Sequence, residues 1–181
     1  MGKKHLMFDI ETLSTKPDAI VLSIGAVLFN KHCITDTFYV NLSMKEQLGN
    51  GRSITESTFY WWMQQAQEAS AAVTTNVQCV GTGLMHLMEW LTDQVDMETL
   101  KVWGNGATFD NVIMRHLLES HGYTEQMLWK FWNDRCFRTC VAENNIEKVH
   151  PDVAHNALAD ARAQAKTLIR YWSKGYADLV L

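Results

Sequence analysis

Proline is scarce in this sequence: only Pro17 and Pro151 occur among 181 residues, and each is expected in a loop. The sequence has no internal repeat and no low-complexity segment. It also lacks any apolar run close to the roughly 20 residues that cross a bilayer, and it opens without the apolar stretch of a signal peptide. We therefore expect a soluble, cytoplasmic protein that does not contact a membrane.

An excess of positive charge is absent as well. Lysine and arginine number 16 against 20 aspartate and glutamate residues, which gives a formal charge of −4 and a pI of about 5.9. This balance excludes a uniformly basic surface for nucleic acid, but it leaves room for a local site with metal ions or a basic patch. The 47% of hydrophobic residues is ordinary for a globular protein, and the length predicts one domain over residues 1–181.

The four cysteines form no Cys-x-x-Cys pair. They are Cys33, Cys79, Cys136 and Cys140, and a zinc site would need a second close ligand pair, which this sequence does not offer. We expect free, buried thiols. The 7 tryptophans are expected mostly in the core or at an interface.

What the sequence does contain is a series of apolar segments typical of strands and helices. Strands are predicted at 6–10, 20–29 and 33–40, the first buried on both faces. Intervals of three and four residues predict helices with one apolar face, such as the face formed by Phe59, Trp62, Met63 and Ala66. The remaining elements, in chain order, are a helix over 84–95, a strand at 100–103, a helix at 110–121, a strand within 129–137, a short helix at 139–144 and a long helix at about 156–172. This order predicts a mixed α/β fold.

Acidic residues stand at the ends of three of these elements. Asp9 and Glu11 are two apart in a strand, so their carboxylates face the same side. Asp110 follows a glycine-rich turn that contains Asn105, and Asp160 lies beside the apolar stripe of the last helix, shortly after His155. Taken singly, each residue has a structural explanation as a turn, a helix cap or a solvated helix face.

Taken together, the four carboxylates and the histidine predict a metal-dependent hydrolase. Hard divalent cations prefer carboxylate oxygens and offset the cost of burying them. A histidine beside such a cluster can act as a general base near neutral pH. This inventory suits hydrolysis of a phosphodiester with two divalent ions about 3.5–4 Å apart.

The same residues resemble the motifs of the DEDD superfamily of 3′–5′ exonucleases, histidine subtype. The matching segments are Asp9 to Thr12, Asn105 to Asp110, and His155 to Asp160, in the family's order. The sequence around 61–65 and 103–106 is most similar to a bacterial and bacteriophage branch of exodeoxyribonucleases and ribonuclease T-like exoribonucleases. The resemblance implies a ribonuclease H-like fold, a five-stranded mixed sheet flanked by helices.

The resemblance also implies roles for the site residues. Asp9, Glu11, Asp110 and Asp160 would hold two divalent cations, Mg²⁺ or Mn²⁺, and Asp9 would bridge both. His155 would take the proton from the attacking water. The substrate-binding residues would be Thr12, Leu13, Asn105 and Phe109, and the flat rings of Phe109 and Trp61 could stack on a base.

The resemblance further implies a substrate and a product. The substrate would be the 3′ end of single-stranded RNA or DNA, and the product a nucleoside 5′-monophosphate. Basic residues at Arg162, Lys166 and Arg170, and at Lys130, Arg135 and Arg138, are candidates for phosphate contacts, although solvated surface charge is the better explanation for any one of them. The aromatic surplus is compatible with a homodimer. Two alternatives are a catalytically silent nucleic-acid-binding module and a ribonuclease H-type endonuclease.

Overall fold

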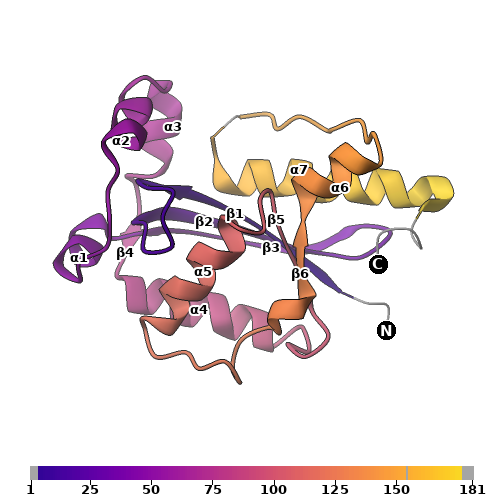
Figure 1. Cartoon of the computed structure of the whole chain (residues 1–181), viewed down its shortest axis with the longest axis horizontal. Coiled ribbons are helices and arrows are strands. Elements are labelled where there is room, and N and C mark those ends of the chain that lie inside the picture. The colour runs from indigo at the N-terminus through magenta and orange to yellow at the C-terminus, as the bar shows by residue number, and fades with distance from the viewer. Residues whose placement is uncertain (1–3, 154, 177–181) are drawn as a thin grey trace.

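The computed structural model describes residues 4–153 and 155–176 of the chain. Its centre is a six-stranded mixed sheet in the order β4-β3-β2-β1-β5-β6 (Figure 1). The first three strands are antiparallel neighbours, whereas β5 and β6 run parallel to β1, and β4 runs parallel to β3. The strands are β1 His5–Thr12, β2 Val21–Phe29, β3 Ile34–Leu42, β4 Val77–Gln78, β5 Lys101–Gly104 and β6 Asp134–Cys136.

Helices cover both faces of this sheet. In Figure 1, α6 and α7 lie above it, α4 and α5 lie below it, and α1, α2 and α3 gather at one end. The helices are α1 Met44–Gly49, α2 Glu56–Met63, α3 Gln67–Ala72, α4 Val80–Thr92, α5 Asp110–Glu119, α6 Phe137–Glu143 and α7 Ala157–Tyr171, with a 3-10 turn η1 at Phe131–Asn133 and a π turn η2 at Trp172–Tyr176.

The alternation of side chains along β1 divides the core into two layers. Leu6, Phe8 and Ile10 pack against α4 and α5, whereas Met7 belongs to the layer under α6 and α7. Because successive residues of a strand point to opposite faces, Asp9 and Glu11 share the side of Met7, the side that α7 covers. The predicted strand that is buried on both faces is therefore confirmed, and its two acidic residues face α7.

Three details differ from the sequence-based expectations. The sheet has a sixth strand, because the two-residue β4 pairs with the end of β3, and so brief a segment leaves no periodic signal. The apolar face predicted around Trp62 is wrong: Phe59 is 47% exposed and Met63 70% exposed, and α2 ends before Ala66. The thiols are free as expected, but only Cys140 is buried, while Cys33 and Cys79 are exposed.

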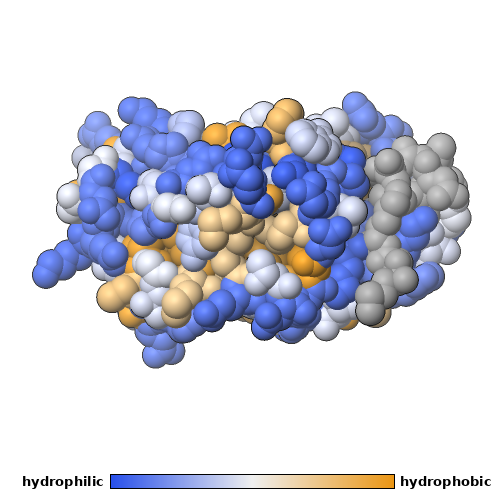
Figure 2. Space-filling view, turned by 90° about the horizontal axis from the view of Figure 1, so that it is seen from below, coloured by the Kyte–Doolittle hydropathy of each residue, from blue (hydrophilic) through white to orange (hydrophobic). Residues whose placement is uncertain are grey.

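The outer surface on the side of α4 and α5 is not uniformly hydrophilic. Figure 2 shows hydrophobic surface in the middle of this face, bordered by hydrophilic residues. Exposed apolar side chains on these two helices include Met85 and Val112. Among the described residues, no helix combines the length and the apolar character that crossing a membrane requires.

Candidate active site

Three carboxylates from two elements converge at the end of β1. Asp9 and Glu11 come from the strand and Asp160 from the first turn of α7, and one oxygen of each lies within 4.8 Å of the others. The expectation that Asp9 and Glu11 face one place is confirmed, and Asp160 joins them as expected. The three residues line a cavity of about 270 Å³, together with Asp110 and His155.

A glycine in β2 allows α7 to come this close. Gly25 pairs with Asp9 in the sheet, and the first turn of α7 lies directly on it. A β-carbon at this position would lie only 2.2 Å from the carbonyl carbon of Ala157 and 2.4 Å from the amide nitrogen of Leu158. Because these are backbone atoms, any larger residue would push the start of α7, and with it Asp160, away from Asp9.

The start of α7 fixes Asp160 through backbone groups. The side chain of Asn156 caps the helix by accepting a hydrogen bond from the Ala159 N–H at 3.0 Å. Burial raises the pKa of Asp160, and the nearby backbone N–H groups of His155 and Asn156 lower it.

Asp110 reaches the same cavity from the neighbouring strand. It is the first residue of α5, just after the turn that follows β5, and its Oδ2 accepts a hydrogen bond from the Gly106 N–H at 3.0 Å. A β-carbon on Gly104 would lie 2.7 Å from the β-carbon of Asp110. Gly104 and the glycine-rich turn after it therefore leave room for the side chain of Asp110.

Burial raises the pKa of all four carboxyl groups, and neighbouring carboxylates raise the pKa of Asp9 and Glu11 further. Burial is the largest cause for each of them. The charges of Asp110, Glu11 and Asp160 add to it, so the pKa of Asp9 lies well above its ordinary value. Burial, with the charges of Asp160 and Asp110, raises the pKa of Glu11 to about 8. Burial also raises the pKa of Asp110 to about 6 and raises that of Asp160. Such a cluster of like charges favours either protons or a divalent cation.

His155 lines the cavity with a strained backbone. Its φ of 59° lies in the left-handed region, which non-glycine residues seldom adopt and which tends to occur at functional sites. Its ring meets the ring of Trp61 edge-on, with centroids 4.9 Å apart. Trp61 is thereby placed beside the cavity, although its helix α2 is distant in sequence.

The predicted substrate-binding residues divide into two pairs. Asn105 and Phe109 line the cavity. Thr12 and Leu13 lie just beyond it: the Thr12 hydroxyl donates to the Ser14 carbonyl oxygen at 2.7 Å, and Leu13 packs in the apolar cluster under α2. For both pairs, contact with substrate stays a prediction.

Sequence reasoning missed one cavity residue, Gln164, and left the role of another, Arg138, open. Gln164 donates a hydrogen bond to Asp9, and its position one helical turn after Asp160 was the signal that could have revealed it. Arg138 also lines the cavity, and its charge lowers the pKa of Asp110. Of the other basic candidates, Arg170 forms an ion pair with Glu147.

The sequence matches that of a family of known proteins. The family model described as the 3′–5′ exoribonuclease Rv2179c-like domain matches residues 4–172, which is nearly the whole chain. The chain belongs to this family. The prediction of a DEDD-type 3′–5′ exonuclease domain is thereby confirmed. The exodeoxyribonuclease of Enterobacteria phage T4 is a more distant relative of this exonuclease domain, 26% identical over 156 residues, which cover 74% of this chain and 68% of the phage protein.

Solved structures share the fold of this exonuclease domain. E. coli Exonuclease I in complex with a 5cy-dT13 oligonucleotide matches 99% of the chain with a TM-score of 0.66 and 15% identity. The zinc-bound form of the E. coli Exonuclease I complex with single-stranded DNA matches with a TM-score of 0.68 and 14% identity. The chain spans only 43% of either Exonuclease I chain. These similarities confirm the ribonuclease H-like fold.

Proposed function

We propose that this protein is a metal-dependent exonuclease that removes nucleoside 5′-monophosphates from the 3′ ends of single-stranded nucleic acid. The observation that carries the proposal is the convergence of Asp9, Glu11 and Asp160 within 4.8 Å, in a cavity that Asp110 and His155 complete. The family description names 3′–5′ exoribonuclease activity, and the phage relative is named an exodeoxyribonuclease.

The donor set fits divalent cations. Carboxylate oxygens are the ligands that Mg²⁺ and Mn²⁺ prefer, and the raised pKa values of Asp9 and Glu11 indicate a concentration of negative charge that a cation would offset. Asp9, Glu11 and Asp160 would hold one ion, and Asp9 with Asp110 would hold the second. Two such ions supply charge stabilisation for the attacking and leaving oxygens.

The chain's own residues then provide orientation and proton transfer. His155 would accept the proton of the water that attacks the terminal phosphorus, while the bond from phosphorus to the 3′ oxygen of the preceding nucleotide breaks. The released 3′ oxygen would take a proton from solvent water, so the products are a nucleoside 5′-monophosphate and a strand with a new 3′ hydroxyl. The edge-on contact with Trp61 and the position beside the start of α7 limit the movement of the His155 ring.

Contacts to the strand would come from the cavity rim. Phe109 lines the cavity and Trp61 is 39% exposed beside it, so both offer faces on which bases could stack. Arg138 is positioned to meet a backbone phosphate, because a guanidinium suits phosphate oxygens. A local cation of this kind is compatible with an overall negative charge.

Hydrolysis of 5′-labelled oligonucleotides tests the proposal. With Mg²⁺ or Mn²⁺ we expect a ladder that shortens from the 3′ end, release of nucleoside 5′-monophosphates, and no product in EDTA. RNA and DNA strands of the same sequence, run side by side, would give the sugar preference. Activity that persists both in EDTA and in Asp9→Asn would contradict the mechanism, and cleavage of a circular single strand would favour an endonuclease.

A further inference from the structure

The side chain of Gln164 extends from α7 to the carboxylate of Asp9. It follows Asp160 by one helical turn, so both residues lie on the same side of α7, and it lines the cavity. Its Nε2 donates a hydrogen bond to Oδ1 of Asp9 at 2.7 Å. The side chain is only 8% exposed, and this hydrogen bond opposes the rise in the pKa of Asp9.

The other end of the same amide has no partner among the described residues. Oε1 of Gln164 is buried and accepts no hydrogen bond there. A buried acceptor without a donor costs free energy, because it has lost its hydrogen bonds to water. The buried amide oxygens of Asn41 and Asn111 also have no partner among the described residues, but Gln164 is distinguished from them because its donor end meets Asp9 and it lines the cavity.

A second buried glutamine shows what a structural role looks like. Gln47 of α1 is fully buried. Its Oε1 accepts a hydrogen bond from the Val21 N–H at 2.9 Å, and its Nε2 donates to the Val21 carbonyl oxygen at 2.7 Å. Both ends of this amide are satisfied by the backbone of β2, whereas Gln164 uses one end on an acidic residue and leaves the other in the cavity wall.

We propose that Gln164 is a positioning residue for the metal site: its Nε2 fixes the orientation of the Asp9 carboxylate, and its Oε1 is an acceptor for a hydrogen-bond donor held in the cavity, such as a water on a divalent cation. The inference rests on the proposed function and names a residue outside the four carboxylates and the histidine. Groups that orient metal ligands in this way commonly change metal affinity or activity by about 10–100-fold when they are removed.

The chemistry of an amide suits this task. A neutral amide can donate to a carboxylate without neutralising it, so the negative charge of Asp9 stays available to a cation. A lysine or arginine at position 164 would form an ion pair with Asp9 and compete with the metal. An apolar side chain would leave Asp9 free to rotate.

Mn²⁺ titration of the full chain tests this role. Gln164→Met preserves the length of the side chain and removes both polar ends. We expect its dissociation constant for Mn²⁺ to rise about 10-fold, kcat on an oligonucleotide to fall, and KM to change little. The melting temperature in EDTA should not fall, because the unpartnered Oε1 is removed together with the donor.

Gln47→Met is the matched control. It removes a fully satisfied buried amide that does not line the cavity, so it should lower the melting temperature in EDTA and leave the Mn²⁺ affinity unchanged. If Gln164→Met does not fold, Gln164→Ala provides the same comparison without a larger side chain in the cavity wall.

The outcomes separate this inference from the proposed function. If the wild-type protein binds Mn²⁺ and hydrolyses the strand while Gln164→Met keeps its Mn²⁺ affinity within twofold, the positioning role is overturned and the nuclease proposal stands. If Gln164→Met behaves like Gln47→Met, the residue is structural. If the wild-type protein binds no Mn²⁺, both proposals fail together.

Discussion

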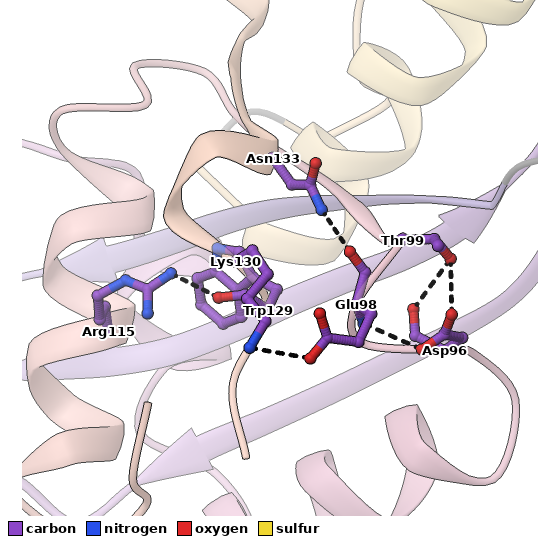
Figure 3. A network of polar contacts seen from close by, with 7 residues as sticks. All are labelled: Asp96, Glu98, Thr99, Arg115, Trp129, Lys130 and Asn133. Atoms are coloured by element: carbon purple, nitrogen blue, oxygen red, sulfur yellow. Dashed lines mark hydrogen bonds and ion pairs between the residues drawn. The ribbon is translucent and has the colours of Figure 1, made fainter. Parts of the chain in front are cut away.

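Two groups of polar residues at opposite ends of β5 are organised in opposite ways. The carboxylate cluster, Asp9, Glu11, Asp110 and Asp160, lies at the end that leads into α5. A second group, which we call the η1 network, lies at the other end and is shown in Figure 3. Its members are Asp96, Glu98, Thr99, Arg115, Trp129, Lys130 and Asn133.

The residues of the η1 network form ion pairs and hydrogen bonds with one another. Lys130 forms an ion pair with Glu98 at 2.9 Å, and Asn133 donates to the Glu98 carbonyl oxygen at 2.9 Å. Arg115 donates to the Trp129 carbonyl oxygen and lies over the Trp129 ring (Figure 3). Opposite charges and hydrogen-bond partners meet here, as in most structural polar groups.

In the carboxylate cluster like charges meet instead, and burial together with the neighbouring carboxylates raises the pKa of Asp9 and Glu11. A fold gains nothing from such repulsion unless a ligand offsets it. The comparison teaches that burial of polar groups does not by itself identify a site. What distinguishes the carboxylate cluster is that carboxylates of like charge lie together, and this is the reason for proposing that it binds a cation.

The largest effect should come from Asp9→Asn, which keeps the shape of the side chain and removes one charge from the cluster. Asp9 is the residue expected to contact both cations, and a loss of about 4 kcal/mol of charge stabilisation corresponds to roughly a thousandfold in rate. Exonuclease assays with saturating Mn²⁺ would measure it. In EDTA the variant should melt no lower than the wild type, since repulsion is relieved; a lower melting temperature would argue against repulsion within the cluster.

Gly25→Ala should break the cluster through the backbone. The added β-carbon would collide with backbone atoms of Ala157 and Leu158, so we expect a loss of roughly 2–4 kcal/mol in the free energy of unfolding and loss of exonuclease activity. Urea denaturation would measure the first. Gly81→Ala in α4 is the control, since a β-carbon there meets nothing within 4 Å and should leave the protein as stable or more stable. Equal stability of the two variants would contradict the role of Gly25.

The pH dependence of stability should reveal the buried carboxyl groups of the cluster. The folded, metal-free protein keeps Glu11 protonated up to a pKa of about 8 and Asp110 up to about 6, whereas the unfolded chain loses these protons near the ordinary values of 4.5 and 3.8. The folded state therefore binds more protons in this window, and its stability should fall as the pH rises through it. Melting curves in EDTA would show the decline, and saturating Mn²⁺ should reduce it. The same decline with and without Mn²⁺ would contradict metal binding by these carboxylates.

The sequence predicted the site better than its surroundings. The spacing of Asp9 and Glu11, and the positions of Asp110 and Asp160 at element ends, were enough to expect convergence, because strand and helix geometry is regular. The apolar residues of α2 were misjudged, since periodicity indicates an apolar face but not what covers it. Trp62 is the buried residue of this helix, and its Nε1–H donates to the Thr12 carbonyl oxygen at 2.9 Å. Gln164 was missed because its partner Asp9 is 155 residues away.

The smallest effect is expected from Lys130→Met in the η1 network. The Lys130 side chain is 17% exposed and that of Glu98 65% exposed, so water screens their ion pair and the change should cost less than about 1 kcal/mol. Denaturation at low and high salt would measure the loss, which should shrink as salt is added. Exonuclease rate and Mn²⁺ affinity should match the wild type, because the network lies at the other end of β5. A Mn²⁺ affinity that changed in this variant would show that the two ends of β5 are coupled, and the contrast between a self-satisfied network and an incomplete one would no longer explain where the chemistry lies.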